Sequence, residues 1–170
     1  NLDLAKLLAL QGGKIVPLAG NASGKADLTF IGTDFKTAGG TVTAEFEASA
    51  GSEDRGLVPI NGSLGIRGVK GLFDIDYAKF NTEKSTLNAT GRFDLSGSNS
   101  NLALALNSTE ASEIERLIKV LNISTDLETQ LAENQINLAG NLKFNGILTG
   151  SLDDPDLDGK ASLESISMRG

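Results

Sequence analysis

The stretch TVTAEFEASA (41–50) decides the fold class of this chain. Its apolar and polar residues alternate one by one, because Val42, Ala44 and Phe46 are each followed by Thr or Glu. Successive side chains of a β-strand point to opposite faces of a sheet, so this alternation predicts a strand with one buried and one solvated face. The stretch therefore predicts a sheet whose two faces differ in polarity.

The same alternation recurs on both sides of this stretch. Roughly nine or ten short segments show it, with turn signals about every 8–12 residues, which is typical of an all-β protein. Their apolar residues are Ala26, Leu28 and Phe30; Ile60, Leu64 and Ile66; Phe73, Ile75 and Tyr77; Leu87, Ala89 and Phe93; Leu102, Leu104 and Leu106; those of 136–144 and 148–152; and Ala161 and Leu163. We expect these residues to share one face of the sheet.

The dipeptide Asn145-Gly146 predicts a hairpin turn between the last two apolar runs. A three-residue loop would pair Leu142 with Leu148 and keep the neighbouring leucines on one face. A two-residue loop would divide them between the two faces. We therefore expect the three-residue loop.

Two segments depart from the alternation. In TEASEIERLIKVLN (109–122) the apolar residues recur at helical spacing, and Ser108 or Thr109 can cap the start. This amphipathic helix should pack on the sheet and close one end or side of its interior, with its acidic residues on the opposite side. Its predicted packing residues are Ala111, Ile114, Leu117, Ile118 and Leu121. A second, short helix is predicted over LDLAKLLAL (2–10).

The composition excludes most catalytic chemistry. The 170 residues include no Cys and no His, so thiolate nucleophiles, zinc knuckles and His-based triads cannot be built. Paired carboxylates remain, around Pro155 (153–158) and at Asp74 and Asp76. The first group lacks the ligand spacing of a calcium loop and is interpreted as a solvated turn. Asp74 and Asp76 are interpreted as outward-facing residues that keep a strand edge soluble. We expect no enzyme, metal or cofactor.

The charge balance argues against a nucleic-acid partner. The net charge is −7, from 15 basic and 22 acidic residues, and the basic residues form no cluster. No apolar run approaches the length of about 20 residues that a membrane-spanning helix needs. Because the sequence begins at Asn1, we expect residues 1–170 to be a single β segment of a larger protein, with any membrane contact made by other parts.

A weak internal repeat is also present. The stretches LAGNASGKADLTF (18–30), INGSLGIRGVKGLFDI (60–75) and LAGNLKFNGILTGSL (138–152) each place an apolar-x-Gly opening before an alternating strand. Such repetition fits an elongated sheet that is extended unit by unit. An ordinary β-sandwich with glycine-rich corners and a closed core is the alternative.

The stretch LAGNLKFNGILTGSLDDPDLDGKASL (138–163) resembles the repeated Leu-x-Gly…Gly-x-Leu-x-x-Pro-x-Leu-x-Gly pattern of the AsmA-like family, and most closely its translocation and assembly module (TamB) branch. The order of strands, the helix in LALALNSTEASEIERLIKVLNI (102–123) and further strands is similar as well. The matching positions are Leu138, Gly140, Leu142, Gly146, Gly150, Leu152, Pro155, Leu157 and Gly159.

The resemblance implies a mainly β fold, in which an elongated antiparallel sheet curls lengthwise into an open apolar groove. It implies the periplasmic part of a cell-envelope protein anchored in the inner membrane. Such a protein would hold phospholipid or other lipid acyl chains and carry phospholipid between the inner and outer membranes. The alternatives are a module for outer-membrane protein assembly that binds strands beside an Omp85-type partner, and a structural or adhesive β-domain with a closed core.

The alternating residues are the candidate lipid-contacting set. A site for acyl chains needs contiguous apolar surface without unpaired polar groups, and ten strands would make a trough on the order of 45 Å long. The predicted lining residues are Leu28, Phe30, Val42, Phe46, Leu64, Ile66, Phe73, Ile75, Leu87, Phe93, Leu102, Leu104, Leu106, Leu138, Leu142, Leu148 and Leu152.

Overall fold

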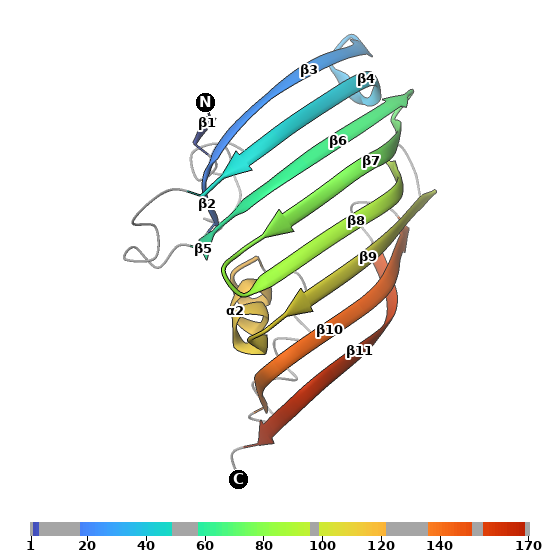
Figure 1. The fold of residues 1–170 in the computed structure, drawn as a ribbon. Helices are drawn as coiled ribbons and strands as arrows, with labels where there is room; N and C mark the ends of the chain where they lie inside the picture. Colours follow the sequence, from blue (N-terminus) through green and yellow to red (C-terminus); the bar gives the residue numbers. More distant parts are fainter. Residues whose placement is uncertain are drawn as a thin grey trace.

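The computed structural model describes residues 2–3, 18–48, 58–95, 99–121, 136–150 and 155–168. Within these ranges the chain is mainly β with one short helix, which confirms the mainly β, antiparallel part of the predicted fold class (Figure 1). The elements in chain order are β1 (Leu2–Asp3), β2 (Leu18–Ala19), β3 (Asn21–Ile31), β4 (Asp34–Glu47), β5 (Val58–Pro59), β6 (Asn61–Val69), β7 (Leu72–Asn81), β8 (Ser85–Asp94), β9 (Ser100–Ser108), α2 (Ala111–Leu121), β10 (Ile136–Gly150) and β11 (Pro155–Met168).

Eight long strands lie side by side in one antiparallel sheet that does not close (Figure 1). The order from one edge is β3-β4-β6-β7-β8-β9, and β10 and β11 continue the sheet beyond β9. At the first edge, β1 pairs with only the first two residues of β3. The small β2 and β5 form a separate parallel pair. Among the described residues, the sheet therefore has two open edges, along β3 and β11.

The strand register places the alternating apolar residues on one face. Val42 lies opposite Ala26 on one side and Ile66 on the other, and Ile66 lies opposite Ile75. Directly opposed residues of antiparallel strands point to the same face. The register continues in the same way through Leu87 and Leu106 on β8 and β9. We call this surface the apolar face and the opposite surface the polar face.

A β-bulge in β7 changes the face of one aromatic residue. The register pairs Gly65 with Tyr77 but Ile66 with Ile75, so Asp76 is an extra residue on β7. The bulge turns Tyr77 to the polar face, where its ring lies over Gly65. The expectation that Tyr77 shares a face with Phe73 and Ile75 is therefore wrong, because an inserted residue reverses the alternation.

The predicted hairpin at Asn145-Gly146 is also wrong. Strand β10 runs through both residues, and Gly146 lies directly opposite Gly159 of β11. A Cβ atom at either glycine would come within 2.5–2.6 Å of the Phe144 ring. These glycines make room for an aromatic ring, and the chain reverses instead between Gly150 and Pro155.

This register also revises the expected acidic turn. Strand β11 includes Asp156 and Asp158, so these two residues do not belong to a turn. Asp153 and Asp154 lie outside the described residues.

Helix α2 lies within the predicted range 109–122 and packs on the apolar face near β9 and β10 (Figure 1). Ala111 and Ile114 are buried against Leu142 of β10, and Leu106 and Leu117 pack against the same cluster. The side chains of Ile118 and Leu121 lie outside the described residues. The helix therefore covers one part of the apolar face.

The predicted N-terminal helix over residues 2–10 is wrong for its first two residues. Leu2 and Asp3 pair with β3 as strand β1, opposite Ala22 and Asn21. The edge of β3 offers free backbone groups, and pairing with them holds these two residues extended. Residues 4–10 lie outside the described ranges.

Candidate functional site

The candidate site is the apolar face. The strand register from β3 to β9 brings twelve of the predicted lining residues onto it. These are Leu28, Val42, Phe46, Leu64, Ile66, Phe73, Ile75, Leu87, Phe93, Leu102, Leu104 and Leu106.

The remaining predicted residues lie toward the ends of the sheet. Leu138 and Leu142 pack with the α2 cluster, while Leu148 lies opposite Leu157 of the edge strand β11. Phe30 lies near the far end of β3, and Leu152 lies outside the described residues. The apolar surface thus extends from one edge strand to the other.

The predicted lining set leaves out two aromatic residues of this face, Phe80 and Phe144. Phe80 lies opposite Leu87, and its ring centroid is 5.5 Å from that of Phe46 in a tilted arrangement. Its position is set by the bulge, which the alternation in the sequence does not reveal. Phe144 lies over the glycine pair Gly146 and Gly159. The sequence offered one signal for Phe144, because an aromatic residue two positions before a strand glycine, here Gly146, can lay its ring over that glycine.

Exposure of the apolar face increases toward its two edges. Phe73 and Leu102, on interior strands, are 3% and 9% exposed. Leu28 and Phe30 on β3 are 39% and 43% exposed, and Leu157 on β11 is 51% exposed. Large apolar side chains in an interior are normally covered, and exposed ones that gather on a surface mark a place where something binds. The edges of the apolar face are therefore its accessible parts.

The polar face has shallow hollows and paired charges. One hollow of about 740 Å³ is lined by Thr41, Arg67, Asp74 and Arg92, among others. Arg92 donates a hydrogen bond of 2.8 Å to Asp74, and Arg67 lies 2.9 Å from Asp76. The hydrogen bond from Arg92 is the main reason that the pKa of Asp74 lies below its ordinary value. These charges neutralise one another in pairs.

The position of these aspartates corrects one expectation. Asp74 and Asp76 point outward, as predicted, but β7 lies between β6 and β8 in the interior of the sheet. They therefore do not protect a strand edge. Their role in the structure is to pair with arginines of the neighbouring strands, where opposite charges contribute modestly to sheet stability.

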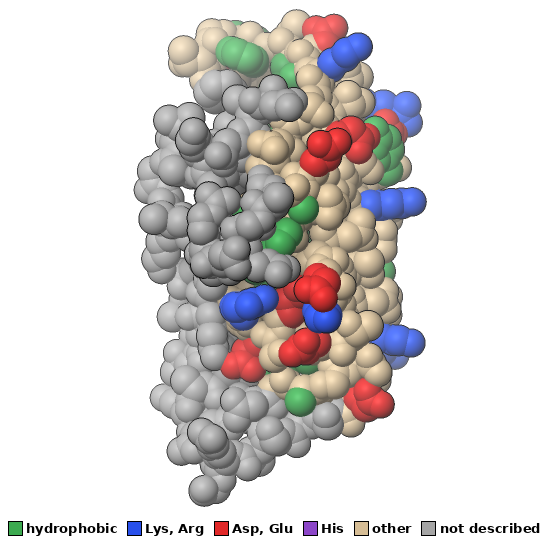
Figure 2. Space-filling model, turned by 60° about the vertical axis from the view of Figure 1, so that its left-hand side comes forward, with side chains coloured by type: hydrophobic (Ala, Val, Ile, Leu, Met, Phe, Trp, Pro, Cys, Tyr) green, Lys and Arg blue, Asp and Glu red, His purple; other side chains and the backbone are tan. Residues whose placement is uncertain are grey.

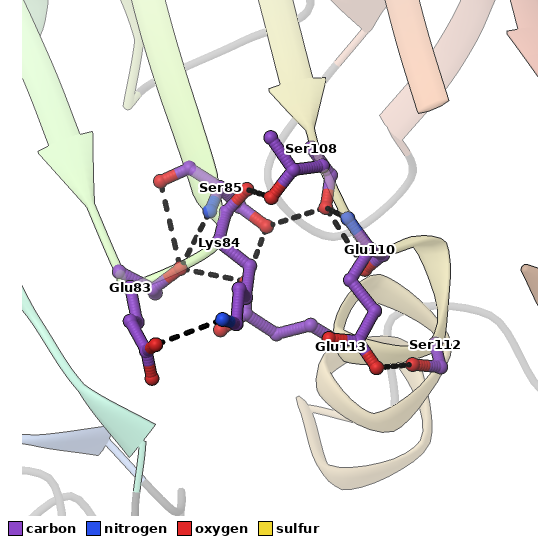
Figure 3. A network of polar contacts seen from close by, with 9 residues as sticks. Glu83, Lys84, Ser85, Ser108, Glu110, Ser112 and Glu113 are labelled. Atoms are coloured by element: carbon purple, nitrogen blue, oxygen red, sulfur yellow. Dashed lines mark hydrogen bonds and ion pairs between the residues drawn. The ribbon is translucent and has the colours of Figure 1, made fainter. Parts of the chain in front are cut away.

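A buried polar cluster fixes the start of α2 (Figure 3). The Glu113 carboxylate accepts hydrogen bonds from the hydroxyls of Ser85 and, at 2.7 Å, Thr82. The Ser85 oxygen also accepts a hydrogen bond from the Ser108 hydroxyl, 2.9 Å away, because the one proton of Ser85 goes to Glu113. Ser85, Ser108 and Glu113 are at most 7% exposed. The expectation that the acidic residues of the helix all lie opposite its packed side is wrong for Glu113, because β8 and the β7–β8 turn supply donors for its carboxylate.

The two predicted helix caps, Ser108 and Thr109, make different hydrogen bonds. The Ser108 hydroxyl accepts a hydrogen bond from the Glu110 amide at 3.1 Å, just before the first helical residue. Thr109 instead donates from its amide and its hydroxyl to the Lys84 carbonyl. Hydroxyl groups at helix starts commonly satisfy such free amides. Together these bonds join the helix start to the β7–β8 turn.

Other kinds of site find little support in the part of the chain that the structure describes. There, no three acidic, His or Cys side chains lie close enough together to hold a metal ion, and no helix is long and apolar enough to cross a membrane. Over the described surface in Figure 2, acidic and basic side chains are interspersed and form no extended patch of one sign. No known protein family, curated protein or solved structure matches this chain.

Proposed function

We propose that this chain is a segment of a lipid-conducting β-sheet, in which the apolar face holds the acyl chains of phospholipids. The observation that carries the proposal is the register, because it aligns the apolar residues of strand after strand on one side of an open sheet. The resemblance to AsmA-like proteins gives the same function.

The chemistry of the apolar face suits acyl chains. From β3 to β7 its positions hold Leu, Ile, Val, Phe, Ala and Gly, which offer no side-chain hydrogen-bond donors or acceptors. The polar residues Ser85 and Ser108 lie on the same face at the end near α2, where they hydrogen-bond to each other. A polar group on such a surface would lose its water without gaining a partner when a lipid tail covered it. Eight strands spaced by about 4.8 Å make a face about 34 Å long. Acyl chains would lie along this length and across the strands.

The proposal includes a groove and a cellular setting. The sheet would curl lengthwise so that its edges approach over the bound tails, while the lipid head groups stay in water. The protein would be a periplasmic part of an envelope protein anchored in the inner membrane, and it would work without a catalytic residue or cofactor. The resemblance supports this setting.

A second function is favoured by a different observation. On the side away from β4, residues 23–29 of β3 carry no paired strand within the described residues, so the backbone donors and acceptors on that side face outward. Such an edge can accept an extended segment as an added strand. This is the chemistry of a module that assists outer-membrane protein assembly beside an Omp85-type partner.

Lipid extraction followed by mass spectrometry tests the proposed function. The purified chain should carry phospholipid, and Leu104→Arg should lose most of it. Leu104 lies on the apolar face opposite Ala89, so an Arg there places a charge among the tails. Ala103→Arg is the matched control, because Ala103 lies next in the chain on the polar face.

Circular dichroism must first show that both variants are folded. Equal phospholipid content in folded Leu104→Arg and Ala103→Arg would contradict the proposal. Absence of lipid from the unsubstituted chain, together with binding of extended β-strand peptides, would favour the assembly function. Asn107→Arg, also on the polar face opposite Thr86, is a second control that should retain its lipid.

A further inference from the structure

The two open edges of the sheet share an unusual feature. The three exposed large apolar residues at the ends of the apolar face are Leu28 and Phe30 on β3 and Leu157 on β11. Edge strands of stable sheets normally carry inward-pointing charges or are covered, because an exposed apolar edge invites pairing. Over residues 22–30 of β3 and 157–163 of β11, the apolar positions instead hold Ala, Gly, Leu and Phe.

Because the number of strands is even, the two edge strands run in opposite directions. Eight strands alternate in direction across the sheet, so β3 and β11 run antiparallel to each other. If a second copy were placed beside the first by translation along the sheet, its β3 would meet β11 in antiparallel orientation. Both apolar faces would then lie on the same side. A single type of contact would therefore continue the sheet and its apolar face without a break.

One alignment of β3 against β11 brings favourable side-chain pairs together on both the polar face and the apolar face. Placing Asp27 opposite Lys160 brings opposite charges together on the polar face. On the apolar face the same register places Phe30 opposite Leu157, so the exposed apolar residues cover one another. A shift of two residues that pairs Lys25 with Lys160 would instead oppose like charges, which destabilises a strand pair.

We infer that this chain associates head to tail with a second copy of itself, β11 of one copy pairing antiparallel with residues 23–31 of β3 in the next. Within the described residues, strand β1 pairs with β3 through Leu2 and Asp3, and in this contact the last residues of β11 would displace it. The contact is heterologous and does not close, so it forms linear chains of copies. The inference concerns the strand edges and does not depend on lipid binding.

Disulfide trapping tests the contact directly, because the chain has no native cysteine. The proposed register places Lys25 opposite Ser162, and directly opposed residues of adjacent strands lie within disulfide range. Mixing Lys25→Cys with Ser162→Cys chains under mild oxidation should yield a mixed dimer, and the doubly substituted chain should yield a ladder of oligomers. Thr90→Cys on the interior strand β8 should form no adduct with Lys25→Cys.

Sedimentation velocity of a matched pair tests the apolar contribution. Leu157→Lys and Ile147→Lys each replace an aliphatic residue that is about half exposed, at 51% and 48% respectively. Leu157 lies on the apolar face at the β11 edge, whereas Ile147 lies on the polar face of β10. Association should weaken by about tenfold or more in Leu157→Lys, because a charge on an edge strand blocks pairing, and stay unchanged in Ile147→Lys.

Several outcomes would overturn the inference. A chain that remains monomeric at every concentration tested would do so. Dimers formed only between two Lys25→Cys chains, or only between two Ser162→Cys chains, would show a two-fold contact instead. Capture of an unrelated β-strand peptide in preference to a second copy would assign the β3 edge to a different partner. Loss of lipid with retained association would remove the proposed function and leave this inference in place.

Discussion

The buried carboxylate of Glu113 should be a main determinant of how firmly α2 is held on the sheet. It accepts hydrogen bonds from Ser85 and Thr82, which lie on β8 and in the β7–β8 turn. A hydrogen bond to a charged group contributes about 1.5–3 kcal/mol to folding. In Glu113→Ala the Ser85 hydroxyl keeps its bond to Ser108, which lowers the loss. We therefore expect the free energy of unfolding to fall by about 3 kcal/mol.

Urea unfolding followed by circular dichroism measures this loss. Glu113→Gln keeps one oxygen acceptor and should lose only about 1 kcal/mol. Glu110→Ala is the matched control, because Glu110 is an exposed acidic residue at the same helix start whose carboxylate accepts a local hydrogen bond from Ser112. It should change stability by less than about 0.5 kcal/mol.

A double-mutant cycle separates the network from the helix itself. Glu113→Ala and Ser85→Ala should be coupled by about 1 kcal/mol or more, because residues in one hydrogen-bond network do not act additively. Additive losses would refute the inferred network. Equal stability of Glu113→Ala and Glu110→Ala would refute the importance of the buried carboxylate altogether.

Three further predictions concern other parts of the fold. Leu117→Ala should lower the free energy of unfolding by about 2 kcal/mol, the low end for truncation of a partly buried Leu; an unchanged urea midpoint would argue against the packing of α2. Gly146→Ala should cost about 1–3 kcal/mol because the added methyl group meets the Phe144 ring and the Asp158 backbone, and a neutral effect in the same assay would count against a continuous β10. The Asp74 carboxyl group, followed by carbon-13 NMR, should titrate with a pKa below its ordinary value, and this pKa should rise toward the ordinary value in Arg92→Gln. Because the folded pKa is the lower one, any contribution to stability is present at neutral pH and is lost as the pH falls through the folded pKa; an identical titration in both proteins would rule out the pairing.

The alternation of residues in the sequence was sufficient to predict the faces of most strands. A period of two in Val42, Ala44 and Phe46 corresponds directly to the pleat of β4, and the same holds for Leu102, Leu104 and Leu106 of β9. The helical spacing in 109–122 likewise predicted α2. These features are local, so nearby residues determine them.

The features that sequence reasoning missed depend on contacts between distant residues. The bulge at Asp76 is set by how β7 pairs with β6 and β8, and no residue near it marks the insertion. The pair Asn145-Gly146 is a common turn signal, but here the glycine lies under Phe144 and opposite Gly159. Glu113 looked solvated on the helix alone, and only the hydroxyls of distant residues explain its burial. Whether the apolar face holds lipid stays a prediction.

The direction of the strands also has a mechanical consequence. Backbone hydrogen bonds of an antiparallel pair run perpendicular to the strands, so in this sheet they point along the line from β3 to β11. A pulling force applied between these two edges would load the bonds one after another, as in opening a zipper, and would not shear a whole strand at once. Since the interior neighbours β7, β8 and β9 are joined in chain order, the molecule would lengthen hairpin by hairpin under low force.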